Sequence, residues 1–368
     1  MPRNCIICGN NVTKIDFRLD YCVSSDAKMI RHAISHSYCE ICAYLFVDEE
    51  NRIEYQTFYK DDYDFLLDGD VEPIIGDVKY SDYLVEFYSE YIPINQKATL
   101  FDIGGGKGNF VNALYEKFPS LEYTVLEPSK SFEILKKKSF IHKLYNDFFD
   151  PKNFDNKYNF LSLIGVLEHV VNPKKFLLDI KTLMDRESYL LIEIPNFKNN
   201  KADLLTIDHI SKFTEESIKN LFFSAGYEIV KQQVLSTVPM QFIVKIGFQK
   251  GLKKIDINKN INNASKYLTQ AFQDAEDVSE EKISIYGQGL ILEYLLGLGV
   301  LKLENIVCII EDNPLYQGKK WKNKLRIVDF ETFEEKYKTN KIYLAMNDCY
   351  HQKVLKKLDK YKVLGSIK

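Results

Sequence analysis

The pattern of apolar and polar positions divides the chain into three stretches. Residues 1–75 hold short apolar pieces between polar turns. From 76 to 250, apolar runs that predict strands alternate with segments of helical spacing. A lysine- and asparagine-rich stretch, Lys250–Asn263, then predicts a linker leading into a helix, and strand–helix alternation restarts after it. We therefore expect three domains, 1–75, 76–250 and 251–368.

The middle stretch predicts a parallel sheet that ends in an antiparallel hairpin. Thr214 is suited to cap a helix that runs to Ala225, and Gly226 is suited to end it. Two strands joined by a short turn follow that helix and predict the closing hairpin. The other expected strands are 98–103, 122–126, 158–166 and 189–194, the expected helices are 109–118 and 173–184, and the hairpin strands are 227–235 and 241–248.

The last stretch predicts a smaller Rossmann-like unit. Its first strand leads into Gly287 and Gly289, but Leu292 stands where a third glycine would complete a dinucleotide motif. We therefore expect this unit to shape an acceptor pocket, where it could hold a nucleotide carrier. The expected strands are 283–286, 305–310 and 341–346, and the expected helices are 290–298 and 351–358.

Composition and charge narrow the class of protein. An apolar content of 45% with 13% aromatic residues is typical of a globular chain. The net charge of −3 gives no sign of a nucleic-acid-binding surface. No apolar run approaches the roughly 20 residues of a membrane span, and the N-terminus has no signal-peptide core. We expect a cytoplasmic protein without a membrane partner, a monomer or weak homodimer whose thiols are reduced.

Four cysteines form two pairs at the spacing of metal-binding knuckles. Cys5 pairs with Cys8, Cys39 pairs with Cys42, and 30 residues separate the pairs. Four thiolates suit tetrahedral zinc, so we expect a structural zinc site. The alternatives are buried unpaired thiols, which would make the double spacing a coincidence, and redox chemistry, for which a single Cys-x2-Cys motif is typical. Cys22 could substitute in principle but lacks a partner at knuckle spacing.

A glycine-rich turn lies between the first strand of the middle stretch and a helix. Such a turn points backbone N–H groups at a ligand. The glycines fall at 104, 105, 106 and 108, but Asn109 stands where a dinucleotide motif counted from Gly104 needs its third glycine. This spacing favours S-adenosylmethionine (SAM), which has no pyrophosphate. Gly104 and Gly106 would let the chain approach the cofactor, and Asp102 would meet its ammonium directly or through water.

Residues after the next three strands complete the predicted cofactor site. Glu127 ends the second strand and can accept both ribose hydroxyls. Asp147 follows the third strand and can receive the adenine amino group, while Phe148 can pack on the purine. After the fourth strand, the backbone near Gly165 would border the sulfonium. The pocket there would be lined by Val166 and Leu167.

Each of these residues alone is also typical of an ordinary strand-to-helix turn, and only their order and spacing together favour the cofactor. His169 belongs to the same turn as Gly165. It lies where a short helix leaves the sheet, so we expect a packed, hydrogen-bonded histidine rather than a catalytic one.

With these motifs the chain resembles the three-domain SAM-dependent methyltransferases that include the sugar C-methyltransferases of deoxysugar pathways. The resemblance rests on the cysteine pairs, on Asp102-Ile-Gly-Gly-Gly, on Val166-Leu-Glu-His-Val and on Ile310-Glu-Asp-Asn-Pro-Leu-Tyr-Gln-Gly318, and it covers essentially the whole chain. It implies an α/β fold with an N-terminal zinc-binding domain, a class I methyltransferase Rossmann-like sheet, and a C-terminal Rossmann-like domain that binds the acceptor.

The resemblance also implies catalytic residues. In the family, a Glu-His pair after the fifth strand works in the acceptor site, with the histidine as base, and a tyrosine before the first strand assists. His209 matches that histidine, Asp208 replaces the glutamate, and Tyr80 or Tyr83 matches the tyrosine. His209 has a suitable ordinary pKa, and Asp208 would orient it or stabilise its cation. The alternative is that His209 caps the following helix.

Three hypotheses of function follow. The first is methyl transfer to a nucleotide-linked sugar, on carbon or oxygen, in carbohydrate biosynthesis. The second is O- or N-methylation of another small metabolite, for example in surface-polysaccharide modification. The third is a nicotinamide-dependent oxidoreductase or a non-catalytic nucleotide-binding protein, against which Asn109 and the cysteine pairs count.

Overall fold

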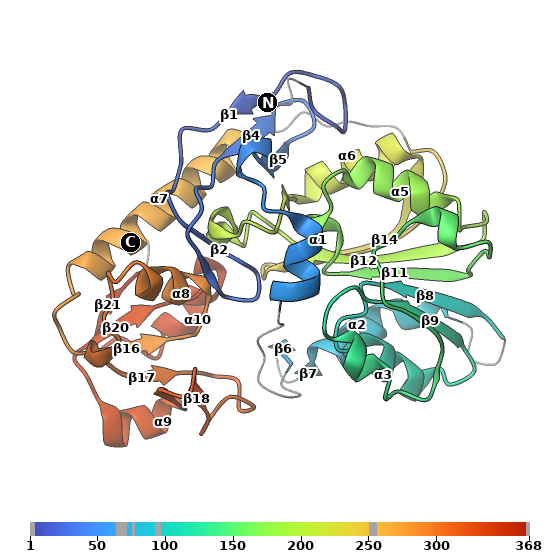
Figure 1. The fold of residues 1–368 in the computed structure, drawn as a ribbon. Coiled ribbons are helices and arrows are strands. Elements are labelled where there is room, and N and C mark those ends of the chain that lie inside the picture. Colours follow the sequence, from blue (N-terminus) through green and yellow to red (C-terminus); the bar gives the residue numbers. More distant parts are fainter. Residues whose placement is uncertain (1–3, 64–71, 76–77, 93–96, 250–255, 366–368) are drawn as a thin grey trace.

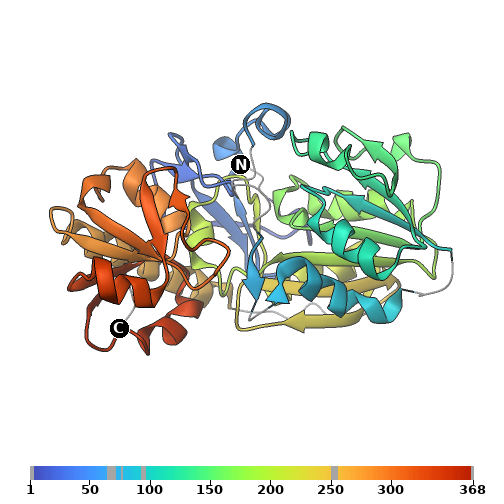
Figure 2. The same ribbon diagram turned by 90° about the horizontal axis from the view of Figure 1, so that it is seen from below.

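The computed structural model describes residues 4–63, 72–75, 78–92, 97–249 and 256–365. Three larger sheets organise them: a seven-stranded sheet, a six-stranded sheet and a four-stranded sheet. The amino-terminal elements (blue) lie between the middle stretch (green and cyan) and the carboxyl-terminal stretch (orange and red), as Figures 1 and 2 show from two directions. Among the described residues, none of the helices combines the length and apolar character needed to cross a membrane.

The seven-stranded sheet confirms the predicted α/β class. Its order is β10-β9-β8-β11-β12-β15-β14, with the first five strands parallel to one another. β15 runs antiparallel to β12 and to β14, so the closing hairpin is confirmed. The strands are β8 (Thr99–Ile103), β9 (Glu122–Leu126), β10 (Ile141–Tyr145), β11 (Phe160–Ile164), β12 (Tyr189–Pro195), β14 (Tyr227–Val234) and β15 (Pro239–Ile246).

Helices cover both faces of this sheet. Neighbouring strand residues alternate between the two faces, so Leu100 packs with the α2–α3 side and Phe101 with the α5–α6 side. The predicted helix after Thr214 is confirmed, since Thr214 and Ser217 form a capping box and Gly226 ends the helix with φ of 78°. The helices are α2 (Tyr80–Tyr88), α3 (Asn109–Lys117), α4 (Phe132–Leu135), α5 (Pro173–Lys181) and α6 (Glu215–Ala225).

The six-stranded sheet has the order β18-β19-β17-β16-β20-β21, with parallel pairing except between β18 and β19. The predicted linker is partly wrong, because α7 already begins at Ile257. Ile257, Ile261 and Ala264 are buried at helical spacing, and this apolar stripe overrides the polar composition. The elements are α7 (Ile257–Glu276), β16 (Ile283–Tyr286), α8 (Leu290–Gly297), β17 (Ile306–Ile310), β18 (Lys320–Trp321), β19 (Leu325–Val328), α9 (Phe330–Thr332), β20 (Lys341–Leu344), α10 (His351–Leu355) and β21 (Lys362–Leu364).

The four-stranded sheet joins the amino-terminal stretch to the middle stretch. Its order is β1-β4-β5-β13, and its last strand, β13 (Ser211–Lys212), directly follows the loop that carries His209. The division into domains at 75/76 and 250/251 remains a prediction. The amino-terminal elements are β1 (Thr13–Lys14), β2 (Cys22–Val23), β3 (Met29–Ile30), β4 (His36–Cys39), β5 (Tyr44–Val47), α1 (Tyr55–Thr57), the π-helix η2 (Phe58–Asp62), β6 (Ile74–Ile75) and β7 (Val78–Lys79).

Candidate functional site

A cavity of about 390 Å³ lies at the carboxyl ends of β8, β9 and β11. Gly104 and Gly106 line it, and both have the positive φ, 79° and 51°, that glycine adopts without strain. A Cβ on Gly104 would come within 2.6 Å of Val166 Cγ2. The predicted glycine turn therefore forms one wall of a ligand-sized cavity.

Glu127 holds this wall from the end of β9. Its carboxylate accepts hydrogen bonds from the backbone N–H of Gly106 at 2.7 Å and of Ser129 at 2.8 Å. The carboxylate also lines the cavity, so it is available to a ligand hydroxyl. One side chain thus fixes the turn and faces the ligand space.

The other predicted cofactor residues divide into those that line the cavity and those that do not. Phe148, Gly165 and Val166 line it. Leu167 is fully buried in the core, so its predicted place in the pocket lining is wrong. It begins the 3-10 helix η5 (Leu167–His169), where its side chain packs among the core residues of the sheet and α5.

Asp102 and Asp147 also lie outside the cavity lining. The Asp102 carboxylate is buried and accepts a hydrogen bond from the Ser162 hydroxyl at 2.6 Å. Burial raises the pKa of Asp102 to about 7. Asp147 is exposed and accepts a hydrogen bond from the Phe148 N–H at 2.8 Å. Their contacts with the cofactor ammonium and adenine stay predictions.

Three tyrosines that the sequence analysis did not select line the same cavity. Tyr55 belongs to α1, Tyr59 to η2, and Tyr63 directly follows η2, all in the amino-terminal stretch. The ring of Tyr55 lies 5.4 Å from that of Phe148. Their spacing of four residues is the signal that could have indicated one helical face.

His209 lies on the loop between η6 (Lys201–Leu205) and β13, and its side chain is only 11% exposed. Its Nδ1 lies 2.6 Å from Asp203 Oδ1. Burial alone would lower the pKa of His209, but the carboxyl groups of Asp203, Asp208 and Glu168 together outweigh burial and raise it, with Asp203 contributing most. Asp203 is therefore the hydrogen-bonding partner of His209, and the prediction that Asp208 orients this ring is wrong. The Asp208 carboxylate does favour the protonated form of His209 through its charge.

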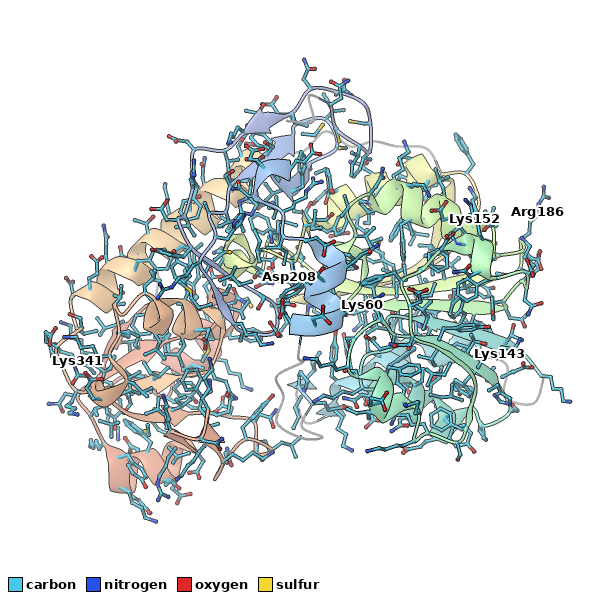
Figure 3. The ribbon with its side chains drawn as sticks, in the orientation of Figure 1. Lys60, Lys143, Lys152, Arg186, Asp208 and Lys341 are labelled. Carbon is cyan, nitrogen blue, oxygen red and sulfur yellow. The ribbon has the colours of Figure 1, made fainter. Side chains whose placement is uncertain are left out.

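Asp208 instead joins the amino-terminal stretch to this loop. Its carboxylate accepts hydrogen bonds from the Ser25 N–H at 2.8 Å and the Ser25 hydroxyl at 2.5 Å. The Tyr59 hydroxyl donates to the same carboxylate at 3.1 Å. Ser25 and Tyr59 thus provide hydrogen bonds to both carboxylate oxygens of Asp208. Figure 3 shows Asp208 close to the segment that carries Lys60.

His169 is packed and hydrogen-bonded, as expected. Its Nδ1 lies 2.5 Å from the Tyr59 hydroxyl and 2.9 Å from the backbone oxygen of Asp208. Its ring meets that of His209 edge-on, with 4.7 Å between the ring centres. Burial lowers the pKa of His169 to about 4, so the ring is neutral at physiological pH.

Tyr80 begins α2, and its hydroxyl is hydrogen-bonded to Glu193 on β12. Burial raises the pKa of Glu193 to about 7. Tyr83 receives a hydrogen bond on its hydroxyl from Gln233 at 2.8 Å. The assisting role of Tyr80 in catalysis stays a prediction.

The four paired cysteines come together as predicted. All four Sγ atoms lie within 4.8 Å of one another. The Sγ–Sγ distance is 3.4 Å between Cys5 and Cys42 and 3.5 Å between Cys8 and Cys39. Tetrahedral zinc with Zn–S bonds of about 2.3 Å needs sulfurs about 3.8 Å apart, so the set fits zinc. Cys22 lies in β2, where its thiol faces the Ile30 carbonyl, and it takes no part in this cluster.

A second, larger cavity of about 1180 Å³ lies at the carboxyl ends of the six-stranded sheet. Gly287 and Gly289 line it, as do Glu311 and Asp312 after β17. Ser25, the partner of Asp208, lines it from the amino-terminal side. The other charged and aromatic residues that line it are Asp26, Glu293, Lys319, Lys320, Lys322, Lys353, Lys357, Tyr286, Tyr316, Trp321 and Tyr350. Of the lysines, Lys322 is paired with Glu293 and Lys357 with Asp312.

The part of the chain that a known family model matches includes the glycine turn that lines the cavity. Residues 77–232 match the family model described as a methyltransferase domain. No curated protein matches the chain. The part of the chain that carries the glycine turn and the seven-stranded sheet is therefore similar to a methyltransferase domain.

Solved structures with a similar fold include three methyltransferases. The mitomycin 7-O-methyltransferase MmcR has 18% identity and a TM-score of 0.38, and the match covers 45% of this chain and 54% of that one. A SAM-dependent methyltransferase from Clostridium acetobutylicum has 14% identity and a TM-score of 0.37, covering 46% and 93%. The O-methyltransferase NcsB1 of neocarzinostatin biosynthesis has 16% identity and a TM-score of 0.38, covering 45% and 55%. The chain thus spans about half the length of two of them.

Proposed function

We propose that this chain transfers the methyl group of SAM to a small-molecule acceptor, a nucleotide-linked sugar or a related precursor of surface polysaccharide. One observation carries the proposal. The cavity of the methyltransferase domain is bordered by His169, whose ring packs on His209, the one candidate base at the carboxyl edge of the sheet that the sequence resemblance also selects. This contact supports a methyl-donor site with a proton acceptor next to it.

Methyl transfer needs an aligned acceptor, a site without water and a group that takes one proton. Bound SAM supplies an electrophilic methyl on its sulfonium. His209 presents its Nε2 as base, because its Nδ1 is held by Asp203 at 2.6 Å. With SAM bound, the acceptor would take the methyl group from the sulfonium, and His209 would receive the proton that the acceptor loses. Asp203 then stabilises the imidazolium.

The large cavity supports an acceptor that carries a nucleotide. Its lysines suit a diphosphate, its aromatic side chains suit a base, and Glu311 follows β17 where a carboxylate can accept ribose hydroxyls. Ser25 lines this cavity and holds Asp208, the neighbour of His209. A carrier bound there would leave its sugar near the candidate base.

The four-cysteine cluster would hold zinc in a structural role. Its four thiolates leave no ligand position for a substrate. The cysteines pack in the same core as β8 and α5, so the metal would stabilise the sheet that carries the cofactor turn.

Two measurements test the proposal. The first is equilibrium binding of SAM and of NAD to the purified chain, where we expect SAM binding; tight NAD binding without SAM binding would overturn methyl transfer. The second is incubation with labelled SAM and a cell metabolite extract, followed by identification of the labelled product. A labelled nucleotide sugar is expected, and a labelled product without a sugar would overturn the acceptor class.

The base is tested separately with His209→Asn. We expect SAM affinity to be retained and turnover to fall by roughly 10²- to 10⁴-fold. His142→Asn, at an exposed histidine on β10, is the matched control and should keep full turnover. A His209→Asn variant that binds SAM and keeps full turnover would remove His209 from the mechanism.

A further inference from the structure

Three side chains with free electron pairs meet beside the cofactor cavity. One ring nitrogen each of His169 and His209 and a carboxylate oxygen of Glu168 all lie within 4.8 Å of one another. Glu168 and His169 belong to η5, directly after β11, and His209 comes from the loop before β13. His169 also lines the cofactor cavity, so a small ion can reach the group from there.

The hydrogen bonds around the two rings leave one nitrogen of each for a ligand. Nδ1 of His169 is held by the Tyr59 hydroxyl and the Asp208 carbonyl, and Nδ1 of His209 is held by Asp203. With Nδ1 occupied in this way, Nε2 is the nitrogen that can bind a ligand. Such outer partners fix the tautomer and orientation of metal-binding histidines.

Glu168 adds an independent observation. Its Oε2 is buried and has no hydrogen-bond partner among the described residues. A buried polar atom without a partner costs about 1–3 kcal/mol, so it indicates a missing ion or ligand atom. The residue is only 3% exposed, and solvent cannot easily satisfy it.

We propose that Glu168, His169 and His209 bind a divalent first-row transition cation, such as Zn²⁺ or Co²⁺. Two imidazoles and one carboxylate are a ligand set that these cations prefer, and three protein ligands leave positions open for water or a substrate oxygen. The buried carboxylate of Asp203 lies 2.6 Å from Nδ1 of His209, and that of Asp208 lies 3.6 Å from Nδ1 of His169, so both favour a positive ion bound by the rings. This site is distinct from the four-cysteine cluster in both residues and ligand type.

Occupation of this site has a consequence for catalysis that rests on the proposed function. A cation bound to Nε2 of His209 takes the electron pair that the base needs. Cation binding and proton removal by His209 therefore exclude each other, and an excess of the cation inhibits methyl transfer.

The test uses Co²⁺ and the full chain with its cysteine cluster already loaded with zinc. Cobalt bound by nitrogen and oxygen gives visible d–d absorption without the thiolate charge-transfer band that a cysteine site would give. In the wild-type chain we expect this absorption to saturate at one equivalent of bound Co²⁺. In Glu168→Gln we expect the absorption to be lost. Glu187→Gln, at an exposed carboxylate, is the matched control and should bind Co²⁺ like the wild type.

SAM affinity measured on the same samples separates the two proposals. A chain that binds SAM but gives no cobalt absorption, or a Glu168→Gln variant that binds Co²⁺ as well as the control, overturns the cation site and leaves methyl transfer standing. If Co²⁺ binds and inhibits turnover, both the site and the base are supported. If Co²⁺ binds and raises turnover, the site stands and His209 is not the base.

Discussion

The cofactor cavity and the region around His209 are built in different ways. Most of the cofactor wall comes from consecutive strand ends of one sheet, so Gly104, Gly106 and Glu127 lie within one short part of the chain. The His209 region instead draws Ser25 and Tyr59 from the amino-terminal stretch to a loop about 150 or more residues later. The first region depends on local backbone geometry, and the second depends on how separate parts of the chain pack.

From this comparison we expect a substitution in the cysteine cluster of the amino-terminal stretch to have the largest effect, because it should lower the stability of both regions. Cys39→Ser removes one thiolate from the proposed zinc site, whose cysteines pack in the main core. Zinc binding contributes about 10–16 kcal/mol in small zinc-binding peptides, whereas whole domains are stable by only about 5–15 kcal/mol. We expect loss of zinc and unfolding of both regions, measured by metal analysis and thermal denaturation.

The matched control is Cys349→Ser, at a half-buried thiol outside the cluster, which should keep zinc and nearly the wild-type melting temperature. If Cys39→Ser keeps its zinc and its melting temperature, the cluster is not a metal site, and the two regions do not depend on it.

The second prediction separates the cofactor region from the acceptor region. Gly104→Ala places a Cβ 2.6 Å from Val166 at φ of 79°, where an L-residue is strained. A cost of about 1–3 kcal/mol corresponds to a loss of SAM affinity of roughly 5- to 140-fold. Gly299→Ala has nearly the same φ, 73°, but meets no atom within 4 Å, so it controls for strain alone. Equal SAM affinity in the two variants would contradict a cofactor role for the turn.

The same contrast explains what the sequence could predict. The strand ends and the glycine turn can be predicted from local spacing. The residues selected in this way that do line the cavity include Gly104, Gly106, Glu127, Phe148 and Val166. Leu167 was misplaced because η5 rotates its side chain into the core, which no spacing rule indicated.

The acceptor region was harder to predict because its hydrogen bonds join distant segments. Asp208 is adjacent to His209 in sequence, yet Ser25 and Tyr59 take its carboxylate, and Asp203 becomes the partner of His209. Only packing of the amino-terminal stretch against the loop decides between the two acids. The resemblance selected Asp208 as the residue that orients His209, whereas the hydrogen bond is made with Asp203. The role of His209 as base stays a prediction.

The third prediction sharpens that point through pH. Asp203 raises the pKa of His209, and a general base works only in its neutral form. Turnover should therefore increase with pH as His209 loses its proton. The midpoint of this increase should lie above the ordinary pKa of histidine. In Asp203→Asn this rise should move to lower pH, because the largest of the contributions that oppose burial is lost. Turnover on the alkaline side should fall about tenfold with the lost charged hydrogen bond.

The measurement is the pH dependence of kcat/KM with the identified acceptor. Asp185→Asn, at an exposed carboxylate, should leave the profile unchanged. An unchanged profile in Asp203→Asn would mean that His209 does not titrate in the catalytic cycle.

The smallest effect is expected at Tyr59, which belongs to both regions. Its ring lines the cofactor cavity, while its hydroxyl contacts His169 at 2.5 Å and Asp208 at 3.1 Å. Tyr59→Phe keeps the ring and removes only the hydroxyl, so SAM affinity should stay within about twofold while turnover falls by roughly 2- to 10-fold, the value of one hydrogen bond. Tyr55→Phe is the matched control, since Tyr55 lines the same cavity and its hydroxyl has no hydrogen bond to a described residue. If Tyr59→Phe weakens SAM binding but leaves turnover unchanged, the Tyr59 hydroxyl contributes to cofactor binding rather than to the acceptor site. The proposed division into two regions would then be wrong.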